Sequence, residues 1–346
     1  MKKIILGAAL ALLIAFVVFQ KSQSARPVRK IFLCTWSNYF SDEIIQEFTD
    51  KTGIQVEISY LSSNEELLAK MRAGNSGLDV VLPSDYMVYQ MGRLGMLAPL
   101  DHTQLGQIKH LDPYFEKLSY DPGLKYSVPF VQGTTGIAVN TAKVDLQGKE
   151  VSWALLFESP DPRHTSLLDD IREVFAASSM YQGRNLNVKS PEALQQAAAV
   201  IQQSKSKVGL FTSEPLPLLL SGEITIAHTY STHGVLASQQ DPNIKFFIPK
   251  EGATIWTDNF VVPAGSVRKS DAHIFINYFL DPENAAKTAA YNKLATPNLT
   301  ARKKLPSGSM IPEVYPSEIV LKRLHFLDDL GSSLTLMTRL WTEVKS

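Results

Sequence analysis

Aromatic rings lie beside carboxylates and hydroxyls in several short segments of the sequence, and this combination of side chains binds organic cations. An aromatic face attracts an ammonium group through its quadrupole and covers neighbouring methylene groups. A carboxylate supplies charge-assisted hydrogen bonds, without which burial of that ammonium costs several kcal/mol. The segments are Trp36-Ser37-Asn38-Tyr39, Ser84-Asp85-Tyr86, Asp170-Ile171-Arg172-Glu173, Tyr230 and Trp256-Thr257-Asp258. If they meet in space, they predict a site for a multiply charged cation such as a polyamine.

Two of these segments carry the acids that would hold the cation. Alternation along a strand places Trp256 and Asp258 on the same face. An aspartate among apolar strand residues needs a partner or an aqueous cleft, so an interior salt bridge is the alternative to a ligand. Asp170 and Glu173 are three residues apart at the start of a predicted helix, where they share a face and the helix N-terminus favours their ionised forms. Ordinary first-turn acids are the alternative for this pair.

No motif in the sequence indicates an enzyme. There is no glycine-rich dinucleotide or phosphate-binding motif, no Gly-x-Ser-x-Gly and no His-Glu-x-x-His. His228 and His233 are five residues apart, which is more than one helical turn, so they do not predict a zinc site. The single cysteine, Cys34, excludes an intramolecular disulfide and lies in an apolar run, where a buried thiol is expected. We expect no catalytic residue, no metal and no cofactor.

The N-terminus predicts export. Lys2 and Lys3 precede an uninterrupted apolar run at 4–19, as in a secretory signal. Residues 1–24 are therefore predicted to be a signal peptide or, if they stay uncleaved, a membrane anchor. Basic and acidic side chains number 34 each in the full chain, and residues 1–24 contain lysines but no acids. The exported part is thus slightly acidic and has no basic footprint for nucleic acid.

Strand and helix patterns alternate in the first third of the chain. Strands are expected at 30–36, 54–61 and 78–82, and helices at 42–52, from Ser63 onward and at 84–94. This order predicts a parallel sheet covered by helices on both faces. In such sheets ligands bind beyond the carboxyl ends of the strands, and the segments at 36–39 and 84–86 follow two of those ends. Without a ligand, Trp36 and Tyr39 are core aromatics and Ser84 is a helix N-cap.

The rest of the chain predicts a second α/β unit. The expected elements are strands at 127–139, 166–168, 224–228, 245–249 and 254–263, and helices at 153–157, 169–177, 191–204, 271–280 and 282–291. The chain length and its 45% hydrophobic residues fit two cores. We expect two α/β domains that are joined by strand crossovers, with a cleft between them.

From about residue 29 to its C-terminus, the chain resembles the periplasmic polyamine-binding proteins, which are the spermidine/putrescine receptors of ABC importers. The resemblance is strongest in Trp36-Ser37-Asn38-Tyr39, in 167–175 with its Asp-Asp-x-Arg-Glu-Val-Phe string, in Pro249-Lys250-Glu251-Gly252 leading to Trp256-Thr257-Asp258, and in Thr296-Pro297-Asn298-Leu299-Thr300-Ala301-Arg302. It implies the two-lobed type II periplasmic binding protein fold, in which each lobe is a mostly parallel sheet flanked by helices. The implied lobes are 29–137 with 258–303, and 138–257 with 304–346.

The resemblance also implies a role for each site residue. Asp258 resembles the acid that holds the inner ammonium or secondary amine, and Asp170 and Glu173 resemble the acids that hold a terminal amine. The implied aromatic box consists of Trp36, Tyr39, Tyr86 and Trp256, the small polar contacts are Ser37, Ser84 and Ser213, and Tyr230 stands where close relatives have Trp. Leu294 and Leu327 stand where spermidine-binding members have Tyr and Gln. The exact polyamine therefore stays open.

Finally, the resemblance implies a periplasmic monomer that delivers a polyamine to the permease and ATPase subunits of an importer. Two alternatives remain at this point. One is an exported protein of the same fold that binds another cation or an amino-acid-like solute, and the other is an exported enzyme or a structural surface protein. A bound amino acid would need a basic partner for its carboxylate, and Arg172 is the only base within the segments.

Overall fold

The computed structural model describes residues 29–74, 76–146 and 148–346. The predicted signal or anchor segment at 1–24 lies outside the described residues. Among the helices that are described, none combines the length and the apolar character needed to cross a bilayer.

The first third of the chain forms the expected β-α-β-α-β unit. Three strands run parallel in the order β2-β1-β3. They are β1 (Arg29–Thr35), β2 (Ile54–Tyr60) and β3 (Val80–Val81), and the helices that connect them and follow them are α2 (Asp42–Thr52), α3 (Asn64–Arg72) and α4 (Asp85–Arg93). The hydroxyls of Ser41 and Ser63 accept hydrogen bonds from the first turns of α2 and α3, which fixes where both helices begin. Gly53 ends α2 with a φ of 70°, a conformation that costs glycine little.

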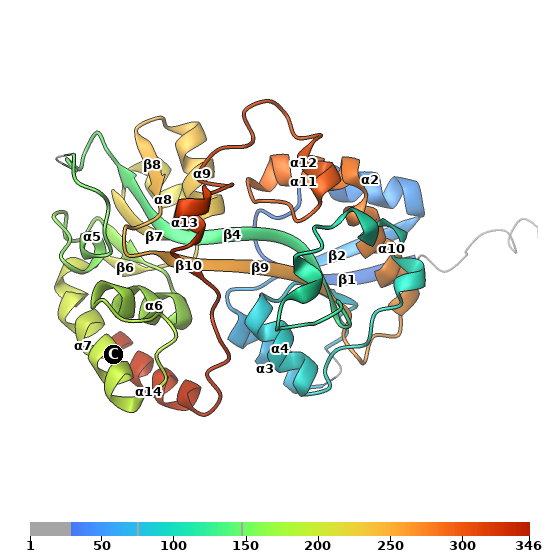
Figure 1. The fold of residues 1–346 in the computed structure, drawn as a ribbon, viewed down its shortest axis with the longest axis horizontal. Helices are drawn as coiled ribbons and strands as arrows, with labels where there is room; N and C mark the ends of the chain where they lie inside the picture. Colours follow the sequence, from blue (N-terminus) through green and yellow to red (C-terminus); the bar gives the residue numbers. More distant parts are fainter. Residues whose placement is uncertain (1–28, 75, 147) are drawn as a thin grey trace, which may run out of the picture.

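Two long strands cross the middle of the molecule and join its two lobes. They are β4 (Ser127–Asn140) and β9 (Ala253–Val261), and Figure 1 shows them running side by side from one lobe to the other. They pair antiparallel from Ser127 opposite Val261 to Thr134 opposite Ile255. The sheet is therefore continuous, in the order β2-β1-β3-β9-β4-β7-β5-β6. The predicted crossover strands at 127–139 and 254–263 are confirmed.

The second lobe surrounds the other ends of these crossover strands. Its strand β5 pairs parallel with both β6 and β7, whereas β8 pairs antiparallel with β4. Its elements are α5 (Ala154–Phe157), β5 (Thr165–Leu167), α6 (Ile171–Tyr181), α7 (Pro191–Ser204), β6 (Leu210–Phe211), α8 (Leu216–Ser221), β7 (Ile226–Tyr230), α9 (Ser231–Gln240), β8 (Ile244–Phe247) and the C-terminal α14 (Ser333–Lys345). α14 packs against α6 and α7, so the end of the chain belongs to this lobe.

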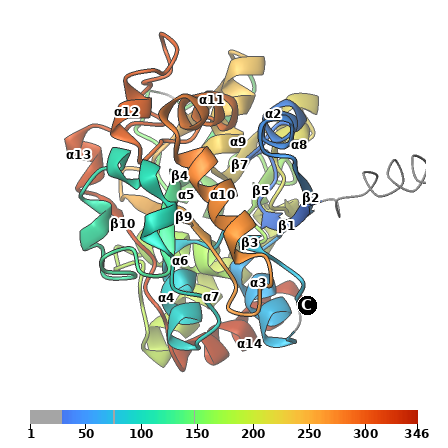
Figure 2. The same ribbon diagram turned by 90° about the vertical axis from the view of Figure 1, so that its right-hand side faces the viewer.

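The chain returns to the first lobe after β9. Figure 2 views the molecule from that lobe, with α10 (Lys269–Leu280) across the front of the sheet, where it contacts β1 and β4. Four short 3-10 helices are η1 (His102–Gln104), η2 (Gly106–His110), η3 (Phe115–Lys117) and η4 (Lys205–Lys207). The remaining elements are α11 (Pro282–Asn292), α12 (Leu299–Arg302), α13 (Glu318–Leu321) and β10 (Leu324–His325). The two-lobed α/β class with helix-covered sheets is thus confirmed. The lobe boundaries at 29–137 with 258–303 and 138–257 with 304–346 stay a prediction.

Each lobe has its own large apolar core. The first lobe packs phenylalanine rings from several elements together. Two of them, Phe275 and Phe279, come from α10, and their ring centroids are 4.6 Å apart. Phe260 of β9 is fully buried beside them. Full burial of one such ring stabilises the fold by about 2–3 kcal/mol. The second lobe is built around Trp153 and Phe175. The two lobes therefore have separate cores on either side of the crossover.

Gly136 of β4 provides a test of this packing. A Cβ atom there would lie 2.3 Å from the carbonyl oxygen of Phe247 and 2.8 Å from the ring of Phe246. Because the neighbouring backbone of β8 would have to move, Gly136→Ala should lower the free energy of unfolding by about 1–3 kcal/mol, measured by urea denaturation. Gly106→Ala is the matched control, since nothing lies within 4 Å of its added atom. Equal stabilities of the two variants would contradict the packing argument.

Candidate ligand-binding site

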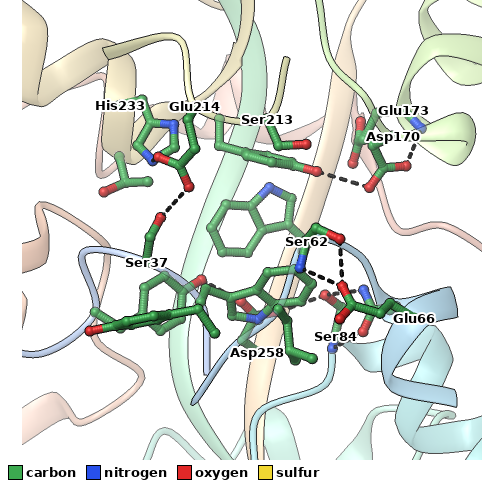
Figure 3. Close-up of a pocket in the computed structure, with 18 of the residues that line it drawn as sticks. Ser37, Ser62, Glu66, Ser84, Asp170, Glu173, Ser213, Glu214, His233 and Asp258 are labelled. Atoms are coloured by element: carbon green, nitrogen blue, oxygen red, sulfur yellow. Dashed lines mark hydrogen bonds and ion pairs between the residues drawn. The ribbon is translucent and has the colours of Figure 1, made fainter. Parts of the chain in front are cut away.

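Every residue that the sequence predicted as a ligand contact lines one cavity between the lobes. The cavity has a volume of about 390 Å³. The predicted residues in its lining are Trp36, Ser37, Tyr39, Ser84, Tyr86, Asp170, Glu173, Ser213, Tyr230, Trp256 and Asp258 (Figure 3). The segments at 36–39 and 84–86 follow β1 and β3, as expected from the topology. The structure therefore brings all the predicted segments together, while their role in binding stays a proposal.

Asp258 lies near the middle of this lining and is held only by neutral partners. Its Oδ1 accepts a hydrogen bond of 2.6 Å from the hydroxyl of Ser84, and its Oδ2 accepts one from the hydroxyl of Tyr39. Burial raises the pKa of Asp258 to about 7, and these two hydrogen bonds offset only part of the effect. Among the described residues no basic side chain pairs with Asp258, so the interior salt bridge is not what this structure shows.

Ser84 shows how the sequence positions Asp258. It stands at the N-cap position of α4, as predicted, but its hydroxyl does not bond the helix. The hydroxyl is instead directed to Asp258, and it accepts a hydrogen bond of 3.0 Å from the amide nitrogen of Asn64. The side-chain oxygen of Asn64 in turn accepts the backbone N–H of Ser84 at 3.1 Å. The predicted cap is therefore right in position and wrong in partner, because the buried carboxylate competes for the hydroxyl.

Asp170 and Glu173 form a second carboxylate pair at the start of α6. Asp170 caps the helix, since its Oδ1 accepts the backbone N–H groups of Arg172 at 2.8 Å and Glu173 at 3.1 Å. Its Oδ2 accepts the hydroxyl of Tyr230 at 2.9 Å, and Thr254 donates to Glu173 Oε2 at 2.7 Å. Burial, followed by the charge of Asp170, raises the pKa of Glu173 to about 8. The expected preference for the ionised form is therefore wrong for Glu173, because burial outweighs the helix N-terminus.

Arg172 lies outside the cavity lining. Its guanidinium donates a hydrogen bond to the backbone carbonyl of Asp328 and lies 4.6 Å from the centroid of the Tyr86 ring. The described cavity lining contains six carboxylates and no lysine or arginine. The described lining of the cavity is therefore acidic.

Aromatic rings form the apolar walls between the carboxylates. Tyr230 and Trp256 meet edge to face, with centroids 5.8 Å apart and planes at 88°. The indole N–H of Trp36 donates to the carbonyl of Leu82 at 2.8 Å, which fixes its ring at the end of β1. Leu327 also lines the cavity, whereas Leu294 is buried outside the lining. Of the two departures from the spermidine-binding pattern, Leu327 alone therefore faces the candidate ligand.

Sequence reasoning missed Glu214 and His233, which line the cavity on the side opposite Asp170 and Glu173 (Figure 3). Ser37 donates a hydrogen bond of 2.5 Å to Glu214 Oε1, across the gap between the lobes. Glu214 directly follows the predicted contact Ser213, and this adjacency was the available signal.

The described residues contain no group of three or more metal-ligating side chains. His228 lies in β7, where the centroid of its ring is 5.2 Å from that of Trp153.

The raised pKa of Asp258 predicts a specific dependence of stability on pH. The folded protein keeps a proton on Asp258 up to about pH 7, whereas the unfolded chain releases it near pH 4. The penalty for ionising the buried group is therefore absent at pH 4, grows as the pH rises, and is complete above pH 7. Asp258→Asn should remove this penalty.

Relative to the wild type, the ligand-free Asp258→Asn variant should gain on the order of 2 kcal/mol of unfolding free energy between pH 5 and pH 8. Urea denaturation at both pH values measures this difference, in which the contributions of the buried histidines cancel. The exposed Asp50→Asn change is the control and should track the wild type. A constant difference between Asp258→Asn and wild type would contradict the raised pKa.

Comparison with known proteins places the chain among solute receptors. Residues 43–313 match the family described as bacterial extracellular solute-binding protein. The chain is 36% identical over 321 residues to spermidine/putrescine-binding periplasmic protein 1 of Haemophilus influenzae, covering 91% of this chain and 89% of the relative. It is 30% identical to a putrescine-binding periplasmic protein of Escherichia coli, with 92% of each chain covered.

A solved structure shows the same arrangement. The spermidine/putrescine ABC transporter substrate-binding protein of Streptococcus pneumoniae superposes with a TM-score of 0.76 at 29% identity. The match covers 92% of this chain and 98% of that one. Sequence and fold comparisons therefore agree over nearly the whole chain.

Proposed function

The chain belongs to the family of bacterial extracellular solute-binding proteins, and from its cavity we propose that it is the polyamine-binding component of an ABC importer. One observation carries this proposal. Six carboxylates and several aromatic rings line a single cavity whose described lining has no lysine or arginine. Spermidine, putrescine or both are the proposed ligands, in agreement with the names of these relatives.

Asp258 lies apart from Asp170 and Glu173 in the cavity (Figure 3), which suits an extended ligand with separated charges. An ammonium beside Asp258 gains a buried counter-charge, and a second one is placed at Asp170 and Glu173. Between these acids, the rings of Tyr230 and Trp256 cover the methylene groups. Each ammonium takes the place of a proton that a buried carboxyl otherwise keeps, so ligand binding should release protons near neutral pH.

The lining disfavours an amino-acid-like ligand. The carboxylate of an amino acid needs a cationic partner, and the described lining offers no lysine or arginine. Arg172, the base nearest in sequence to the site acids, is engaged by the Asp328 carbonyl and the Tyr86 ring. Burial lowers the pKa of His233, so this histidine is neutral at pH 7. No feature of the site favours catalysis over binding.

The two lobes give the mechanism. Trp36, Ser84 and Asp258 belong to elements of the first lobe, whereas Asp170 and Tyr230 come from the second. A ligand that contacts both sets at once stabilises the closed arrangement over the open one. We place the protein in the periplasm as a monomer that presents the ligand to the permease and ATPase subunits. In this proposal residues 1–24 serve export, either as a cleaved signal or as an anchor.

A thermal-shift titration tests the ligand class. Putrescine, cadaverine, spermidine and spermine are compared with arginine and lysine at equal concentrations. A ligand that binds only the folded state stabilises it by an amount that grows with concentration, about 2.7 kcal/mol at 100 times its dissociation constant. We expect a concentration-dependent rise of the melting temperature with at least one polyamine and none with the amino acids. The absence of a shift with every polyamine would refute the proposal.

Asp258→Asn tests the residue on which the proposal depends most. The change keeps the size of the side chain but leaves the bound ammonium without its counter-charge, so it should weaken polyamine binding by at least about 2 kcal/mol. Isothermal titration calorimetry measures this loss against the exposed Asp50→Asn control, which should bind as the wild type does. Unchanged affinity in Asp258→Asn would remove this residue from the site.

A further inference from the structure

One end of the cavity carries an arrangement that the two carboxylate stations proposed above, Asp258 and the Asp170–Glu173 pair, do not explain. Glu214 comes from the loop between β6 and α8, His233 from α9, and Ser37 from the loop after β1. In Figure 3 these three side chains lie on one side of the cavity, Asp170 and Glu173 lie on the other, and Asp258 is below and between them. Four of the six lining carboxylates, Asp170, Glu173, Glu214 and Asp258, therefore lie at three separate places along the cavity.

His233 is the least satisfied side chain at this end. It is only 4% exposed, and its Nδ1 has no hydrogen-bond partner among the described residues. Its Nε2 has one long contact, 3.4 Å to the amide nitrogen of Asn38, and lies 3.7 Å from Glu214 Oε2. The separation from Glu214 is too long for a hydrogen bond. Burial lowers the pKa of His233 against the opposing charge of Glu214, so the neutral ring can accept a hydrogen bond.

One carboxylate oxygen of Glu214 accepts no hydrogen bond from the described residues. Its Oε1 accepts the hydroxyl of Ser37 at 2.5 Å, whereas Oε2 faces the imidazole. A donor placed between Oε2 and the ring nitrogen can bond both, and the oxygen of Ser37 still has a lone pair to offer. A primary ammonium has three N–H donors and one positive charge, which matches these acceptors and the charge of Glu214.

We propose that Glu214, His233 and Ser37 bind a third, terminal ammonium, so that the cavity is built for a linear triamine and not for a diamine. This inference rests on the proposed function and adds the number of charges on the ligand. A diamine can occupy Asp258 and the Asp170–Glu173 pair, but it leaves Glu214 without a cation. A triamine places one ammonium at each of the three stations, with its secondary amine at Asp258.

The contact between Ser37 and Glu214 has a second explanation. It joins the two lobes, so it can stabilise the closed form whether or not an ammonium is bound beside it. The two explanations differ in what they predict. A contact that only closes the lobes affects every ligand equally, whereas a subsite affects only the ligand that reaches it. The side chain of Glu214 is 55% exposed, so its effect on a triamine should be modest.

The experiment compares spermidine and putrescine in wild type and Glu214→Gln by isothermal titration calorimetry. This variant keeps one acceptor oxygen for Ser37, removes the charge and replaces the other carboxylate oxygen with an NH2 donor. We expect spermidine to bind about 5- to 20-fold more weakly and putrescine to change by less than about twofold. Glu223→Gln is the matched control, because it removes one charge from an exposed position of the same lobe outside the cavity.

A second comparison identifies the group that Glu214 contacts. N1-acetylspermidine and N8-acetylspermidine each lack the charge on one terminal nitrogen. Acetylation of the end that reaches Glu214 should weaken binding to the wild type, and this loss should be smaller by about fivefold or more in Glu214→Gln. For the other isomer the losses in the two proteins should be equal. The comparison cancels the added bulk of the acetyl group, which is present in both proteins.

Each remaining outcome has one meaning. Equal weakening of spermidine and putrescine in Glu214→Gln, or no coupling with either acetylated isomer, overturns the subsite and leaves the lobe contact as the role of Glu214. In both cases polyamine binding by the wild type survives, and so does the proposed function. If the wild type binds neither putrescine nor spermidine, the proposed function itself fails and the subsite fails with it.

Discussion

Carboxylates that are removed from water without a cation raise one another's free energy, and this protein holds several of them around one cavity. The structure supplies Asp258 and the Asp170–Glu173 pair with hydroxyl donors from tyrosine, serine and threonine side chains. A neutral donor offsets part of the cost of burial but leaves the net charge in place. The remaining cost appears as a pKa of about 7 for Asp258 and about 8 for Glu173. The buried carboxyl groups of Asp258 and Glu173 therefore keep protons where the proposed ligand would place ammonium groups, and the rest of the fold holds these side chains in position.

The crossover strands determine the geometry of that set. On β9, Trp256 and Asp258 face the cavity, while the backbone N–H of Thr257 between them donates to the buried Asp85 at 2.8 Å. On the paired strand β4, a Cβ at Gly133 would lie 2.4 Å from the indole of Trp256. Only a glycine leaves room for this ring at its observed place. One wall of the site thus depends on a missing side chain in the neighbouring strand.

Local patterns were sufficient to predict much of this arrangement. A few neighbouring positions are enough to predict the strand ends and the cap residues Ser41 and Ser63. The composition of the acid and aromatic segments indicates what kind of ligand they can bind. Composition did not single out Glu214, and its position next to Ser213 was the available local signal. It lies in a loop without an aromatic neighbour, and its partner Ser37 is 177 positions away in the chain. The charge state of Glu173 was missed for the same reason, because its burial comes from the packing of distant strands and not from the helix that carries it.

Contacts between described side chains join the lobes across the cavity. Arg172 of the second lobe lies on the Tyr86 ring of the first, and Ser37 bonds Glu214. Interactions of these kinds contribute about 1 kcal/mol each when they are partly exposed. Such contacts can hold the lobes near closure, and in the proposed function a ligand that joins Asp258 to Asp170 adds to the preference for the closed form. Affinity then depends on the open–closed equilibrium as well as on the cavity. A change in the crossover strands can therefore alter affinity for every ligand equally, whereas a change in one carboxylate alters it according to which ammonium that carboxylate meets.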